Sequence, residues 1–177
     1  MYTVRDAEPQ DLLWIADHMR QSDKDEIAAQ SGADAKTAMM MGKFFSPYMK
    51  VACLGEIPVL IFGVCPTDNP LIGKVWMLAT DILQNPRCRK LLARHSREWV
   101  DDMQALYPAL TNITDARNTV HHRWLKWCGF KFIQRFNHGP IGAPFIEFVR
   151  IQSNVWYWYC AINGCRDCWK TSWNNWK

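Results

Sequence analysis

The sequence predicts a single α+β domain, in which helices flank a central mixed, mainly antiparallel sheet, followed by an aromatic-rich C-terminal extension. The length of 177 residues fits one compact domain with its own core. The patterned segments run strand, helices, three strands, helix, strand, helix and two strands. Five tryptophans gather in residues 154–177, so we expect the domain to occupy residues 1–150 and the extension residues 151–177.

The first elements are a short strand and two helical stretches. Residues 2–5 alternate as a strand does. Pro9 is tolerated in the first turn of a helix, and apolar residues then recur every three or four positions, which predicts an amphipathic helix over residues 9–21. A second helical stretch, residues 28–41, is interrupted at Ser31-Gly32.

Strands follow in the middle of the chain. Residues 51–54 and 57–63 predict a hairpin, because Gly55 supplies the turn between them. Residues 75–80 read as a buried strand. The remaining expected elements are a helix over 86–105, a strand over 110–114, a helix over 118–128, and closing strands over 130–133 and 145–149.

The helix expected over residues 86–105 has an apolar side and a charged side. Its apolar stripe is predicted to contain Leu92, Trp99, Met103 and Leu106. On the charged side, we expect two ion pairs at i,i+4 spacing, Arg94 with Glu98 and Arg97 with Asp101.

Charge is distributed unevenly along the chain. The first 34 residues carry eight acids and three bases, whereas residues 117–135 carry five bases and no acid. The net charge of +4 is modest, so the alternatives are an ordinary solvated surface and a face that meets anionic partners. We find neither an uninterrupted apolar segment long enough to span a membrane nor the charge order of a signal peptide, and we expect a cytoplasmic chain.

Three stretches resemble the GNAT (acyl-CoA N-acyltransferase-like) superfamily. They are Val4-Arg5-Asp6-Ala7 with the downstream Asp11 and Ile15, the strand 75–81 with its basic loop and helix, and Asn118 followed eleven residues later by Gly129-Phe130. More narrowly, Trp76, Thr80-Asp81, the arginine-rich helix and the Asn118 to Gly129 segment resemble the GNAT-like internal virion proteins of short-tailed, podovirus-type bacteriophages. The resemblance implies an acetyl-CoA site and a GNAT-like domain.

In that superfamily, backbone amides at a glycine-rich helix start hold the diphosphate of acetyl-CoA. The corresponding run here contains Gln84, Arg87, Cys88 and Arg89, and the resemblance adds Asn118 to the implied cofactor-binding residues. Arginines replace both small residues of the family pattern. Either they close the site or their guanidinium groups hold phosphate themselves.

The catalytic residues are also altered. Many family members place a tyrosine, the general acid, where this chain has Leu125, which has no proton to give. His121 is the stand-in that we select, with His122, Cys128 and Tyr107 as alternatives. Asp81, at the end of the central strand, is the candidate general base or else the N-cap of the next turn, and Glu56 and Asp115 are weaker candidates for the base.

These observations favour a catalytically degenerate GNAT-fold pseudoenzyme of a bacteriophage, a virion-associated structural or interaction protein located in the virion or the host cytoplasm. The alternative is an active acetyl-CoA-dependent N-acetyltransferase that modifies or inhibits a host protein. The expected partners are other virion proteins or a host protein. We expect no sequence-specific nucleic-acid partner.

The aromatic extension predicts a docking or membrane-interface segment. Cys160, Cys165 and Cys168 have the spacing of metal ligands, but three thiolates without a histidine do not complete a zinc site, so we expect no metal. The other four cysteines are isolated among apolar residues and are expected to be buried thiols rather than disulfides.

Overall fold

A computed structural model describes residues 2–152, and the predicted extension from residue 153 onward lies outside that range. The element order agrees with the sequence prediction. The elements are β1 (Tyr2–Asp6), α1 (Pro9–Asp17), α2 (Gln21–Ser31), α3 (Ala35–Phe45), β2 (Tyr48–Leu54), β3 (Ile57–Pro66), β4 (Ile72–Ala79), the 3-10 turn η1 (Asp81–Gln84), α4 (Pro86–Leu106), β5 (Ala109–Asp115), α5 (Thr119–Trp127), β6 (Lys131–His138) and β7 (Ala143–Ile151).

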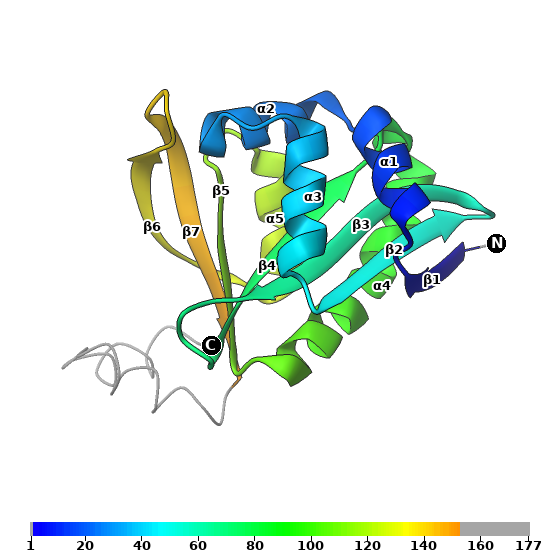
Figure 1. The fold of residues 1–177 in the computed structure, drawn as a ribbon. Helices are drawn as coiled ribbons and strands as arrows, with labels where there is room; N and C mark the ends of the chain where they lie inside the picture. Colours follow the sequence, from blue (N-terminus) through cyan, green and yellow to red (C-terminus); the bar gives the residue numbers. More distant parts are fainter. Residues whose placement is uncertain (1, 153–177) are drawn as a thin grey trace.

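The strands form one seven-stranded sheet in the order β1-β2-β3-β4-β5-β7-β6. Every neighbouring pair is antiparallel except β4 and β5, which are parallel. Figure 1 shows α1 and α3 in front of the sheet and α4 and α5 behind it. The predicted α+β architecture with a mixed, mainly antiparallel sheet is therefore confirmed.

Each face of the sheet has its own core. On the α4–α5 face, Leu92, Trp99 and Met103 of α4 pack against the sheet as predicted. Leu106, expected on the same stripe, is 50% exposed in the last turn of α4.

On the α1–α3 face, alternate β4 residues such as Trp76 contact the helices. Within residues 2–152, no helix is both long and apolar enough to cross a membrane.

The helix predicted over residues 9–21 is wrong at its C-terminal end. α1 stops at Asp17, and the next residues pair with the end of β4. The Arg20 N–H donates to the Ala79 carbonyl at 2.9 Å, and Met19 forms a β-bridge with Thr80. A long-range backbone contact therefore overrides the local helical periodicity.

Neither ion pair predicted along α4 is present among residues 2–152. Glu98 lies beside His95 at 3.6 Å, and Asp101 accepts a hydrogen bond from Arg150 instead. The two α4 arginines that were expected to pair are left without a carboxylate partner in the described part of the chain.

Candidate functional site

A crevice opens where the two parallel strands separate. β4 and β5 pair at only three positions and then diverge, as Figure 1 shows. On the other edge of β4, the Thr80 N–H donates to the Val59 carbonyl of β3 at 2.8 Å. Because an antiparallel ladder alternates, the N–H and C=O groups of Val75, Met77 and Ala79 point away from β3 and into the gap.

Groups from elsewhere in the chain satisfy most of this exposed edge of β4. The Asn112 side-chain amide donates to the Val75 carbonyl at 2.6 Å. At the other end, the Asp23 carboxylate accepts from the Ala79 N–H at 2.8 Å, and the Arg20 N–H donates to the carbonyl of the same residue. Met77 lies between these two positions, in the middle of the gap, and it lines both cavities of the crevice.

Helix α2 joins the two walls of the crevice. Asp23 and Glu26 are three residues apart, so both project from one face of the helix. Asp23 binds β4, while Glu26 accepts hydrogen bonds from the Asp115 N–H and the Asn118 side-chain amide, each at 3.2 Å. Burial raises the pKa of both carboxyl groups. α2 is therefore a polar clip between β4 and the β5–α5 junction.

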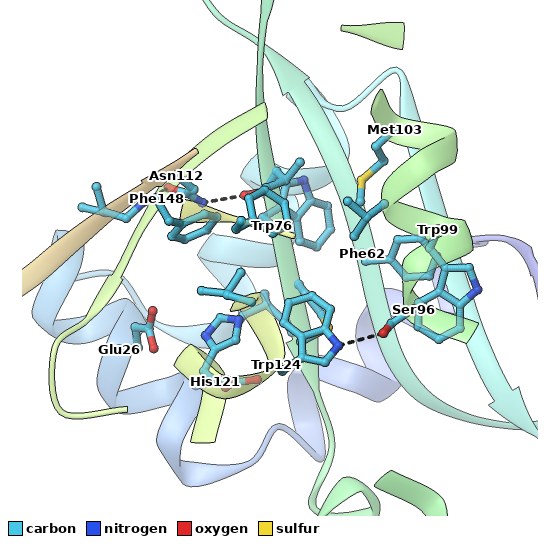
Figure 2. A pocket seen from close by; sticks show the side chains of 18 of the residues that line it. Glu26, Phe62, Trp76, Ser96, Trp99, Met103, Asn112, His121, Trp124 and Phe148 are labelled. Carbon is cyan, nitrogen blue, oxygen red and sulfur yellow. Dashed lines mark hydrogen bonds between the residues drawn. The ribbon is translucent and has the colours of Figure 1, made fainter. Parts of the chain in front are cut away.

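Two aromatic residues of α5 fill much of the crevice. The Trp124 indole N–H donates to the Ser96 hydroxyl at 2.9 Å, and the His121 ring stacks on Trp124 with ring centroids 5.4 Å apart (Figure 2). The Nδ1 atom of His121 also lies 3.2 Å from the Thr114 hydroxyl, within hydrogen-bond distance. Burial, assisted by the positive charge of Arg20, lowers the pKa of His121 to about 3. The imidazole is therefore neutral at physiological pH.

Among residues 2–152, the crevice region contains cavities of about 100 and 360 Å³. Four of the seven predicted site residues line the larger one: Gln84, Arg89, Asn118 and His121. The other three do not line it: Asp81, Arg87 and Cys88. The structure thus brings together only part of the predicted site. Within residues 2–152, no group of three His, Cys, Asp or Glu side chains is placed to hold a metal ion.

The residues outside the cavity have structural surroundings. Asp81 is exposed at the start of η1, where it accepts a hydrogen bond from the Gln84 side chain. The N-cap position of this turn belongs to Thr80. The Cys88 side chain is buried in the core, and burial raises the pKa of its thiol. The Arg87 side chain is exposed.

No family model and no curated protein sequence matches this chain. Solved structures do match it. Aminoglycoside acetyltransferase AAC(6')-Ib in complex with coenzyme A is 16% identical with a TM-score of 0.63, over 88% of this chain and 97% of that one. The acetyltransferase of the GNAT family from Streptococcus pneumoniae is 14% identical with a TM-score of 0.57, over 85% and 99%. The ribosomal-protein-S18-alanine N-acetyltransferase from Escherichia coli is 13% identical with a TM-score of 0.60, over 85% and 94%.

The chain has the GNAT acetyltransferase fold. Within this fold, the start of α4 is where the resemblance implied that main-chain amides would hold a diphosphate. Here the Asn85 side-chain oxygen accepts from the Arg87 N–H at 2.9 Å and from the Cys88 N–H at 3.4 Å. Pro86 has no N–H, and the Arg89 N–H donates to the Asn85 carbonyl. The first turn of α4 therefore does not fit a diphosphate held by main-chain amides.

Four residues that shape this GNAT-fold crevice are not among the predicted site residues: Arg20, Asp23, Glu26 and Asn112. The i,i+3 spacing of Asp23 and Glu26 indicates a shared helix face. The backbone amides that they bind, however, lie 56 residues from Asp23 and 89 residues from Glu26 along the chain. Arg20 lies within residues 9–21, where the periodicity predicts a helix. Asn112 lies inside a predicted strand, where nothing local indicates a bond across the gap.

Proposed function

We propose that this GNAT-fold protein is catalytically degenerate and works by binding another macromolecule, as a virion-associated interaction protein. The observation that carries the proposal is the Asn85 cap. A diphosphate would have to displace the Asn85 oxygen from the Arg87 and Cys88 amides before it gained any main-chain donor. The chain already satisfies the donors that an active enzyme would keep free for coenzyme A.

The acid–base groups support the same conclusion. Leu125, at the position where many GNAT enzymes have a tyrosine, is 1% exposed and packs in the core. His121 points into the crevice, but its lowered pKa leaves it without an ionisable proton to donate near neutral pH. Asp81, the predicted base, does not line the cavity. Leu125 and the neutral His121 therefore supply no general acid at the crevice, and the predicted base Asp81 lies outside it.

The surface of α3 supports a role in protein contact. Met40, Met41, Phe44 and Phe45 lie at i, i+1, i+4 and i+5, so they share one helix face, and Phe44 is 82% exposed. Exposed apolar side chains that gather in this way mark protein-interaction sites. The likeness of the sequence to internal virion proteins of short-tailed phages leads us to propose a protein of the particle, or a host protein, as the partner.

Isothermal titration with acetyl-CoA tests the degenerate site. We expect the wild type to release no binding heat at micromolar concentrations. Asn85→Gly uncaps two amides at a cost of a few tenths of a kcal/mol, so it should gain affinity, whereas Asn85→Ser keeps a capping oxygen and serves as the matched control. Micromolar binding by the wild type would overturn the proposal.

The virion role has a separate test. Mass spectrometry of purified phage particles should detect this chain, and its absence from them would end that part of the proposal.

The second candidate is an active N-acetyltransferase. It is favoured by the larger cavity, where Arg89, Gln84 and Asn118 converge in a volume of about 360 Å³. In that case the Arg89 guanidinium, rather than a main-chain amide, would hold phosphate. Release of free thiol from acetyl-CoA in the presence of the wild type and candidate amine acceptors would favour this function over the first.

A further inference from the structure

The outer surface of α4 is basic over its first three turns. Between Pro86 and Arg97 this helix has five bases and no acid. Four of them, Arg87, Lys90, Arg94 and Arg97, are spaced by three, four and three residues, so they follow one solvent-facing stripe, and all four are exposed. At 1.5 Å per residue, the stripe is about 15 Å long, with one cation about every 5 Å.

Helix α5 extends the stripe sideways. The Arg97 side chain donates to the Trp127 carbonyl at 2.7 Å and lies 3.9 Å from the centre of its ring. The hydrogen bond between Trp124 and Ser96 fixes the same pair of helices on the inner side. Arg123, one turn before Trp127, is also exposed. We name the set Arg87, Lys90, Arg94, Arg97 and Arg123 the basic ridge.

The basic ridge makes no ion pair within the described chain, and the neighbouring Glu98 of α4 contacts His95 instead. No side chain of the ridge has a carboxylate within ion-pair distance among residues 2–152. Asp101, the acid that the sequence placed beside Arg97, is engaged by Arg150. Most acids of the first 34 residues belong to α1 and α2 or their flanks, which lie on the front of the sheet, whereas α4 and α5 lie behind it (Figure 1).

We propose that the basic ridge binds the phosphodiester backbone of nucleic acid without reading base sequence. Four of its five cations are guanidinium groups, which bind phosphate in bidentate geometry, and a rigid helix holds them in a line at a spacing comparable to that of phosphates along a strand. The partly exposed Trp127 ring, 51% accessible, adds a surface on which a base or sugar can pack.

The surface favours nucleic acid over a lipid membrane. A helix that lies in a membrane interface buries an apolar face in the lipid and carries its lysines and arginines on the opposite face. On α4, however, none of the large apolar side chains exposed to solvent comes before Leu106 at its last turn. The outward face of the ridge is charged throughout, so it matches a polyanion that stays in water.

Fluorescence anisotropy of a labelled 30-base-pair DNA duplex with the full chain tests the proposal. Each neutralised phosphate contributes about −0.9 to the slope of log K against log salt, so five contacts predict a slope of about −4.5. Affinity should then fall about 500-fold between 50 and 200 mM salt. Duplexes of unrelated sequence should bind equally.

Two triple variants with the same change in net charge distinguish binding by the basic ridge from attraction of DNA to the net positive charge of the protein. Lys90→Gln, Arg94→Gln and Arg123→Gln should reduce the magnitude of the slope by about 2.7. Lys36→Gln, Lys43→Gln and Lys74→Gln, on α3 and β4, should change it far less.

The following results would overturn the proposal: no duplex binding by the wild type at 50 mM salt, equal losses in both triple variants, or binding to phosphatidylglycerol vesicles in place of DNA. The ridge variant leaves Arg89 and the crevice intact, so the acetyl-CoA titration and the DNA titration can fail independently. Arg94→Lys, which keeps the charge, should retain most of the affinity and so guards against loss of folding as the cause.

Discussion

Replacing Gly139 by alanine tests the contact between the β6–β7 turn and α2. Gly139 has a φ of 75°, and an added Cβ would lie 1.9 Å from the Ala29 carbonyl oxygen at the C-terminal part of α2. Behind this contact, Ala29, Ala143 and Phe145 form a small core of their own. The substitution therefore forces the turn and the helix apart by more than 1 Å and disturbs that core.

Gly142 in the same turn is the matched control. Its φ is 60°, and an added Cβ would have no atom within 4 Å. Both substitutions carry the cost of a left-handed alanine, about 1–2 kcal/mol, and both gain about 0.4–1 kcal/mol by restricting the unfolded chain. Gly142→Ala should therefore cost about 1 kcal/mol. Gly139→Ala adds the clash with backbone and should cost about 3 kcal/mol.

Urea denaturation followed by tryptophan fluorescence measures both free energies of unfolding. In thermal unfolding the corresponding decreases in Tm are about 2–4 °C for Gly142→Ala and about 6–12 °C for Gly139→Ala. Equal losses in the two variants would refute the close approach of the turn to α2.

Three further results are expected. Asn85→Ala should lower the free energy of unfolding by about 1 kcal/mol in thermal melts, because two amides lose their cap, and Asn85→Ser should stay near the wild type. Burial raises the pKa of Glu26 in the folded state, so the folded protein binds its proton more tightly than the unfolded chain and stability falls as pH rises above the unfolded pKa. Glu26→Gln should flatten that decline in urea titrations at pH 4 to 7, and an unchanged profile would contradict the burial. The His121 imidazole, with a pKa of about 3, should show no NMR titration between pH 5 and 8.

The sequence predicted the order of the elements because each is encoded locally. Strand alternation, Pro9 and Pro86 at helix starts, and the Gly129 stop can all be read within a few residues. The error at residues 18–20 has a non-local cause, since those residues leave the helix to pair with β4. Predicted ion pairs on α4 failed for a related reason, because Arg150, far along the chain, captures Asp101.

The candidate site could be predicted only where the family pattern has fixed positions. Gln84, Arg89, Asn118 and His121 were found in this way, and they do line one cavity. The cap by Asn85 was within reach of sequence reasoning, because an asparagine before a proline at a helix start is a strong N-cap signal. The hydrogen bonds of Asp23 and Glu26 could not be predicted, because no local pattern specifies which distant backbone amides a carboxylate will bind.

The clip formed by α2 couples two strands that do not touch each other along the crevice. Asp23 shields the Ala79 amide of β4, and Glu26 shields the Asp115 amide at the end of β5. Solvent reaches either amide only when the same helix lifts away, so the two should exchange their hydrogens through one shared opening. Hydrogen exchange should therefore report the same opening free energy for the Ala79 and Asp115 amides, although they belong to different strands.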